Sequence, residues 1–238
     1  MNHVKKFFAV AAVLAAAGLS SPAFSQSKQA APQSAEAKAK ADAEVDKKAE
    51  EWVASLNLND AAKEARLKQV IATHLKAVRD WHNSHSAADV PAGINLVSGN
   101  KMSDLERQVI ADSAIPKSVH EDLMSGLRKD LTEQQVEEIL DKYTIGKVAF
   151  TMKAYKEIVP NMTAQEEDTI LKNLKQAREQ AIDFKNMTEI SAIFEIYKTK
   201  NEQFLNANGR SWKQMYKEYT AALKAKKAAD AAAAQKKN

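Results

Sequence analysis

The fold is decided by residues 143–183, which read YTIGKVAFTMKAYKEIVPNMTAQEEDTILKNLKQAREQAID. An apolar segment in the first half of this stretch ends at Pro160, a residue that cannot continue a helix. A second helical pattern begins at Thr163, where Thr163 and Glu166 have the spacing of a capping box. Gly146 interrupts the pattern near the start. The stretch therefore predicts two helices and an irregular entry around Gly146.

Helical periodicity and capping signals recur on both sides of this stretch. A first helix is expected from about Ala43 to Leu56. Apolar residues then recur at intervals of three and four from Leu67 to Trp81, over about six turns. Further helix starts are expected at Asn59 or Asp60, at Ser103 with Glu106, at Thr132 with Gln135, near Thr188, and at Ser211. Residues 84–102 contain many turn formers and are expected to form a loop.

The composition supports an all-α fold. The chain is rich in Ala, Lys, Glu, Leu and Gln, which favour helices, and it has only 6 Gly and 5 Pro. No segment of the sequence reads as a strand. We expect a single multi-helix domain of about seven to nine helices over residues 44–222, with an antiparallel, bundle-like arrangement.

The N-terminus has the pattern of a secretory signal peptide over residues 1–25. Lys5 and Lys6 precede a 14-residue apolar run, and small residues flank the expected cleavage point after Ser25. Residues 26–43 read as a low-complexity leader, and residues 223–238 as an Ala/Lys-rich tail. The chain has no cysteine, which excludes a lipoprotein anchor and disulfides. We expect a periplasmic or secreted protein with no stable membrane anchor after cleavage.

The formal charge of +4 is concentrated at the two ends of the chain. Two lysines belong to the signal peptide, and the segment from Ala221 onward has five lysines and one aspartate. The body between them is therefore near neutral or mildly acidic. Nucleic-acid binding, which needs a basic face, is not expected.

Signals for catalysis or metal binding are weak. His82 and His85 have a spacing that can ligate a metal, but no further ligand cluster completes a site in the sequence. His74 and His120 stand isolated. Carboxylate pairs fall in first turns and on polar faces of helices, where the helix dipole explains them. Nucleophile elbows and phosphate-binding loops are absent. We expect no catalytic residue, no metal and no cofactor, and favour a protein without enzymatic activity.

Aromatic and basic residues near Gly146 are the best candidates for ligand binding. Aromatic rings provide flat faces on which sugars stack, and basic groups bind uronate carboxylates. The aromatic residues considered are Tyr143, Phe150, Tyr155, Tyr197, Trp212, Tyr216 and Tyr219. Packing in a helical core is the competing explanation for most of them. The residues selected as ligand-binding are Tyr143, Lys147, Tyr155 and Arg178, because the break at Gly146 is not explained by a simple helix pattern.

The same motifs resemble those of the domain-of-unknown-function 3826 family. The resemblance follows the order of Thr132 and Gln135, Thr144 and Gly146, Ala154, Tyr155 and Pro160, Thr163, Ala177, Arg178, Glu179 and Ala181, and Gly209. It covers about residues 45–222. Met162 stands where the family usually has Leu. The resemblance implies an exported protein of Bacteroidetes-like bacteria, encoded beside pectin- and polysaccharide-degrading enzymes, with a sugar-binding role.

Three functions follow as hypotheses. The first is a non-catalytic accessory to polysaccharide utilisation that binds a pectic oligosaccharide. The second is a periplasmic chaperone or stress protein, because two Leu/Met-Thr-x-x-Gln/Glu helix starts are similar to those of the Spy and CpxP family. The third is a cryptic hydrolase or lyase that acts on polysaccharides.

Overall fold

The computed structural model describes residues 34–96 and 98–235 of the chain, with side chains described through Ala229. These residues form nine α-helices and one short 3₁₀ helix. Their β-structure is limited to one isolated antiparallel bridge between Ile94 and Lys101. The prediction of a single all-α domain with seven to nine helices is therefore confirmed for the part of the chain that the structure describes.

The helices follow one another through short connections, apart from the loop before α3. Their bounds are α1 Ala35–Ala54, α2 Ala61–Ser84, η1 Ala87–Asp89, α3 Asp104–Asp112, α4 Lys117–Asp130, α5 Glu133–Tyr143, α6 Lys147–Ile158, α7 Ala164–Ala181, α8 Met187–Ala207 and α9 Trp212–Gln235.

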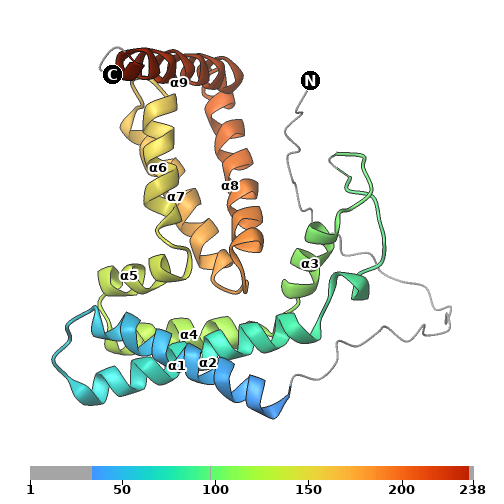
Figure 1. Cartoon of the computed structure of the whole chain (residues 1–238), viewed down its shortest axis with the longest axis vertical. Helices are drawn as coiled ribbons and strands as arrows, with labels where there is room; N and C mark the ends of the chain where they lie inside the picture. The colour runs from blue at the N-terminus through green and yellow to red at the C-terminus, as the bar shows by residue number, and fades with distance from the viewer. Residues whose placement is uncertain (1–33, 97, 236–238) are drawn as a thin grey trace.

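The helices are arranged in two layers with separate hydrophobic cores (Figure 1). In the first layer, α1, α2 and α4 lie side by side and α5 closes one end. In the second layer, α6, α7 and α8 stand upright on the first, and α9 crosses their far end. The turn between α7 and α8 points down into the junction between the two layers, close to α3.

The first core is built from α1, α2, α4 and α5. Leu67 and Ile71 of α2 and Leu127 of α4 are fully buried in it. Gly126 permits close approach of α4 and α2, because a Cβ at this position would lie 2.7 Å from Val70 Cγ2. The apolar stripe predicted for α2 is therefore its buried face.

The second core is built from α6, α7, α8 and the start of α9, with Val109 of α3. Arg210, between α8 and α9, fixes the α6–α7 turn by donating to the carbonyls of Pro160 and Asn161, each at 2.9 Å. It also binds Glu166 through two nitrogens at 2.9 and 2.8 Å. These hydrogen bonds lower the pKa of Glu166 to about 2. The α8–α9 connection thereby holds the start of α7 in place.

Three consecutive residues after α7 join the two cores. Ile182 is buried in the first core, whereas Phe184 is buried in the second. Asp183 lies between them and its carboxylate faces two histidines of the first layer. The α7–α8 turn therefore links the layers by apolar and polar contacts at once.

The predicted caps agree with the structure. Asp60 caps α2, and Ser103, Thr132 and Thr163 each form the expected capping box. One helix start differs, because α1 begins at Ala35 rather than near Ala43. The earlier turns of α1 are held by ion pairs to the end of α2, with Asp42 at 2.5 Å from Arg79 and Lys38 at 3.0 Å from Asp80. Sequence composition does not reveal these long-range pairs.

The break at Gly146 is a tight joint between α5 and α6. Ile145 and Gly146 both have left-handed backbone conformations, with φ of 52° and 65°. The Gly146 N–H donates to the carbonyl of Asp141 at 2.9 Å, which closes the end of α5. A β-branched residue in this conformation is strained. Ile145 is also 71% exposed, so its side chain gains little packing energy to offset the strain.

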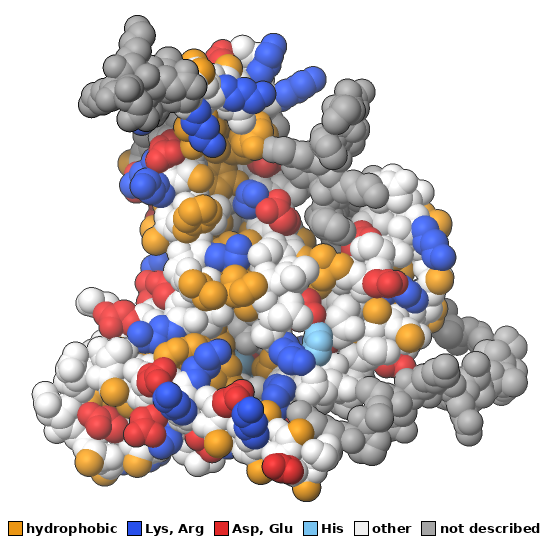
Figure 2. Space-filling view, in the orientation of Figure 1, with side chains coloured by type: hydrophobic (Ala, Val, Ile, Leu, Met, Phe, Trp, Pro, Cys, Tyr) orange, Lys and Arg blue, Asp and Glu red, His pale blue; other side chains and the backbone are white. Residues whose placement is uncertain are grey.

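No helix among the described residues is both long and apolar enough to span a bilayer. The predicted signal peptide and residues 26–33 of the predicted leader lie outside the described residues, whereas residues 35–43 of that leader belong to α1. On the face shown in Figure 2, basic and acidic side chains are interspersed and hydrophobic ones form small groups. This surface agrees with the near-neutral charge expected for the body of the protein.

Replacing Ile145 by Asn is predicted to stabilise the protein. Asn tolerates the left-handed conformation better than a β-branched residue, and relief of the strain is worth about 1 kcal/mol. The free energy of unfolding, measured by urea denaturation, should rise by about this amount.

Leu96→Asn is the matched control, because Leu96 is 74% exposed and is not among the residues with positive φ. Its stability should stay within about 0.5 kcal/mol of the wild type. An Ile145→Asn variant no more stable than the wild type would contradict the assigned strain.

Candidate functional site

The four residues selected from the sequence do not form one surface site. Tyr143 is 8% exposed and belongs to the first core, where its ring packs at 4.8 Å from Trp52 and 5.3 Å from His74. Burial raises the pKa of Tyr143 well above its usual range. Tyr155 is 2% exposed and belongs to the second core, where its hydroxyl donates to the Lys198 carbonyl. Neither ring offers a face to a sugar in this structure.

The two basic residues of that set are also engaged within the fold. Arg178 is 3% exposed, and its Nη1 donates to Asp141 at 2.7 Å. Lys147 Nζ lies 5.6 Å from the centre of the Phe194 ring, and burial lowers the pKa of this lysine. The four residues selected around the break at Gly146 thus make contacts between helices and do not line an open site. Phe150, by contrast, is 76% exposed and lies outside both cores.

The two histidines that appear isolated in the sequence share one carboxylate. His74 of α2 lies with Nε2 3.0 Å from Asp183 Oδ1, and His120 of α4 lies with Nδ1 2.9 Å from Asp183 Oδ2. His74 is 2% exposed, whereas His120 is partly open. The expectation that His74 and His120 stand alone was therefore wrong. Each oxygen of Asp183 is matched by one imidazole nitrogen.

This arrangement raises the pKa of His120 and lowers that of Asp183. The hydrogen bond to Asp183 raises the pKa of His120 above its usual range, against the opposing effect of burial. Burial alone pushes the pKa of Asp183 upward, but the hydrogen bonds from His120 and His74 outweigh it, so the net shift is downward. Asp183 is thus an ionised carboxylate at neutral pH, held in place from two sides.

His120 and Asp183 also line a groove between α4 and the α7–α8 pair. One hollow of about 340 Å³ extends from Asp112 and Ser113 past Lys117 to Asp183. A second hollow of about 480 Å³ is lined by His120, Gln176, Glu179, Gln180 and Tyr197. Because both hollows share His120 and Gln180, they adjoin and form one groove.

The lining of the groove is mixed, because Ile115, Pro116 and Phe184 add apolar walls to the first hollow while polar side chains dominate the second. The second ring nitrogen of His120, Nε2, lies 3.8 Å from Glu179 and can exchange a proton with a ligand. Ser113 is the hydroxyl residue in the first hollow, but its Oγ donates to the Val109 carbonyl at 2.6 Å. This orientation differs from that of a nucleophilic serine, whose hydroxyl donates to a histidine.

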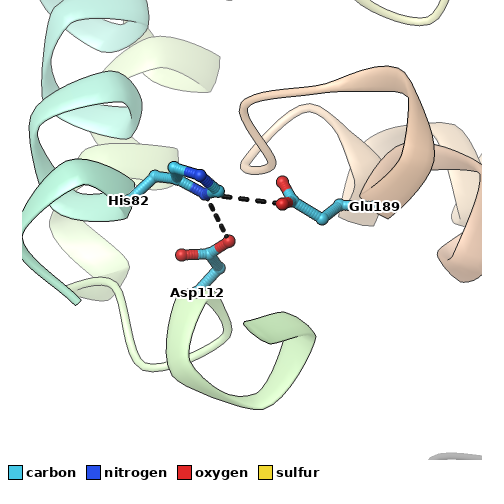
Figure 3. Close-up of side chains that lie close together, drawn as sticks. All are labelled: His82, Asp112 and Glu189. Carbon is cyan, nitrogen blue, oxygen red and sulfur yellow. Dashed lines mark hydrogen bonds and ion pairs between the residues drawn. The ribbon is translucent and has the colours of Figure 1, made fainter. Parts of the chain in front are cut away.

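A second histidine–carboxylate cluster is formed by His82, Asp112 and Glu189 (Figure 3). His82 of α2 has its Nδ1 2.8 Å from Asp112 and 3.5 Å from Glu189. His85, whose spacing from His82 can ligate a metal, does not join this cluster, because it stacks on Trp81 with the ring centres 3.7 Å apart. Burial raises the pKa of Glu189; His82 opposes this shift and Asp112 adds to it. Among the described residues, this cluster is the one group of three or more such side chains whose ligand atoms could together hold a metal.

One sequence signal for these clusters was available. His74 falls on the apolar stripe of α2, in phase with Leu67, Ile71 and Val78. A polar residue on a core-facing stripe requires a buried partner. Asp183 and Glu189 gave no comparable signal, because they lie 109 and 107 residues farther along the chain than His74 and His82, respectively.

A family model described as a protein of unknown function, DUF3826, matches residues 42–225. The chain belongs to the DUF3826 family. The match begins within α1 and ends within α9, so the DUF3826 region includes both layers and the groove. The resemblance drawn from the sequence motifs is thus confirmed, whereas the similarity to Spy and CpxP receives no support from it. No curated protein matches the chain.

His120 is predicted to make stability depend on pH above neutrality. Its folded pKa is raised, so the protonated form stabilises the fold fully below the unfolded pKa of about 6.5. This contribution is lost as the pH rises through the folded pKa. Asp183 affects stability at acidic pH instead. Because its pKa is lowered, its contribution to the free energy of unfolding is lost only as the pH falls below about 4.

The free energy of unfolding should therefore decline more from pH 6 to pH 9 in the wild type than in a His120→Gln variant. His85→Gln serves as control, since His85 forms no ion pair with a carboxylate within the described residues. It should keep the wild-type slope. Equal slopes for the wild type and His120→Gln would show that the pair with Asp183 adds no pH-dependent stability.

Proposed function

We propose that this protein is an exported, non-catalytic accessory of polysaccharide utilisation that binds an oligosaccharide in the groove between α4 and the α7–α8 pair. The observation that carries the proposal is a groove of two adjoining hollows whose lining combines amides, carboxylates, an imidazole and aromatic rings. Its two hollows, about 340 and 480 Å³, fall in the range typical of small-ligand sites. The N-terminal signal pattern supports export.

The side chains of α7 suit the hydroxyl groups of a sugar. Gln176, Glu179 and Gln180 are spaced at i, i+3 and i+4, so they project from one face of the helix toward the groove. Amides supply both donors and acceptors, and a carboxylate supplies acceptors, which together match hydroxyls that act as both. Tyr197 of α8 adds a partly exposed ring beside them.

The charges of the groove favour a neutral oligosaccharide. Four carboxylates line it, against two basic groups, Lys117 and His120; the carboxylates are those of Asp112, Glu121, Glu179 and Asp183. A polyuronate chain would meet these carboxylates with like charge. The basic residues first considered for uronates, Lys147 and Arg178, do not line either hollow. A neutral segment of a pectic or other plant polysaccharide therefore suits the groove better than a polyuronate backbone.

The chaperone hypothesis receives less support from the surface. Large exposed apolar side chains in the described residues occur as separate small groups, with Ile94 and Leu96 before α3 and Ile145 and Phe150 at the α5–α6 joint. A client-binding surface needs a contiguous apolar area of several hundred Å² or more.

Sugar binding is predicted to depend on Gln180 and Tyr197. The mature chain is titrated by calorimetry with neutral and uronic oligosaccharides of plant cell walls. Gln180→Ala and Tyr197→Ala should each weaken binding of the neutral ligands by about tenfold, because each removes a direct contact.

Gln165→Ala is the matched control, since Gln165 is exposed on the same helix about four turns away. It should bind as the wild type does. Absence of heat with every glycan, or equal losses in Gln165→Ala and Gln180→Ala, would overturn the proposal. Release of shorter sugars during the titration, detected by chromatography, would replace it with a hydrolase or lyase.

A further inference from the structure

Three helices bring potential metal ligands to one buried point, distinct from the residues proposed to contact a sugar (Figure 3). His82 comes from the last turn of α2, Asp112 from the end of α3 and Glu189 from the first turn of α8. One ligand atom from each residue lies within 4.8 Å of the others. In Figure 3 both carboxylates point toward the His82 ring.

The cluster contains more negative charge than its protein partners balance. Asp112 is 2% exposed and Glu189 is 3% exposed. No lysine or arginine in the described ranges forms an ion pair with either carboxylate, and His82 supplies at most one positive charge. Buried carboxylates of this kind need a cation or a proton. A divalent cation bound by neutral His82 balances the two carboxylates completely.

One oxygen of the cluster is left without a partner. Glu189 Oε2 is buried and accepts no hydrogen bond within the described part of the chain. Most buried side-chain oxygens are satisfied, so an unsatisfied carboxylate oxygen requires an explanation. Because Glu189 faces His82 and Asp112, a cation at this point supplies the missing contact.

The remaining carboxylate oxygens are held by amide side chains. Gln108 Nε2 donates to Asp112 Oδ1 at 3.1 Å, and the same nitrogen donates to the His85 carbonyl at 2.9 Å. Asn186 Nδ2 donates to Glu189 Oε1 at 2.7 Å while Asn186 caps α8. Hydrogen bonds of this kind orient the ligands in metal sites. The two carboxylates are therefore fixed before a cation arrives.

We propose that His82, Asp112 and Glu189 bind a divalent transition-metal cation of the Zn²⁺ or Mn²⁺ kind. One imidazole and two carboxylates form a donor set suited to these ions. On binding, the Nδ1 proton of His82 is released to solvent, the ring keeps its proton on Nε2, and the Nδ1 lone pair coordinates the cation in place of the hydrogen bond to Asp112. Three protein ligands leave coordination positions for water or for a ligand.

The site adjoins the groove through one of its three residues. Asp112 lines the same hollow as His120 and Asp183. A cation on Asp112 therefore lies at the inner end of the groove proposed for the oligosaccharide. The metal site uses none of the residues assigned to sugar contacts, so each proposal can be tested without the other.

Zn²⁺ is predicted to bind the mature protein at one site. After dialysis against a chelator, the wild type is titrated with Zn²⁺ by calorimetry, and its melting temperature is measured with and without the ion. Binding should be saturable at one equivalent and should raise the melting temperature by mass action. His82→Gln and Glu189→Gln should each weaken Zn²⁺ binding by tenfold or more.

Two control variants separate this site from other histidines. His85→Gln changes the neighbouring histidine that stacks on Trp81, and His120→Gln changes the histidine bound to Asp183. Both should bind Zn²⁺ as the wild type does.

The Glu189→Gln variant also distinguishes ligation from a structural role. It removes the excess charge, so without metal it should be at least as stable as the wild type, yet it should lose the rise in melting temperature. No saturable Zn²⁺ binding by the folded wild type would overturn the proposal. Wild-type affinity in both His82→Gln and Glu189→Gln would overturn it as well.

Discussion

The interaction on which this structure depends is the carboxylate of Asp183 between two imidazoles. Asp183 follows α7 directly and reaches His74 of α2 and His120 of α4, at 3.0 and 2.9 Å. Its neighbours Ile182 and Phe184 are buried in different cores. A carboxylate in this place is stable only while its partners are present, because loss of one leaves a buried charge uncompensated. These three adjacent residues thus contribute to the docking of the upright layer on the first layer, together with other contacts such as the ion pair of Arg178 with Asp141.

The groove and the cluster of His82, Asp112 and Glu189 both lie at this junction between the layers. His120 holds Asp183 with one ring nitrogen and faces the groove with the other. In the first turn of α8, Glu189 meets His82, which also binds Asp112. The binding groove and the proposed metal site therefore flank one short connection. A ligand at either place acts directly on the contact between the layers, which gives the junction a role in both stability and binding.

The fold was largely predictable because its signals are local. Capping boxes at Ser103, Thr132 and Thr163 fixed three helix starts, and the apolar stripe of α2 predicted its buried face. The start of α1 was misplaced, since it depends on ion pairs with residues almost forty positions away. Local patterns do not encode such pairs.

The candidate site was less predictable for the same reason. Tyr143 and Tyr155 attracted attention because Gly146 interrupts a helix, yet the structure explains both by burial. The histidine clusters join residues that lie from 30 to 109 positions apart in the chain, and only His74 gave a signal, through its place on an apolar stripe. Pairing between buried polar groups is a property of the assembled layers and is not visible in a single helix.

Titration of His120 followed by nuclear magnetic resonance tests this account most directly. The chemical shift of its ring proton is measured against pH in the wild type and in an Asp183→Asn variant, which keeps the size of the side chain and removes its charge. We predict a pKa above the ordinary histidine value in the wild type and a clear fall in the variant. The same pKa for His120 in both proteins would contradict the role assigned to Asp183.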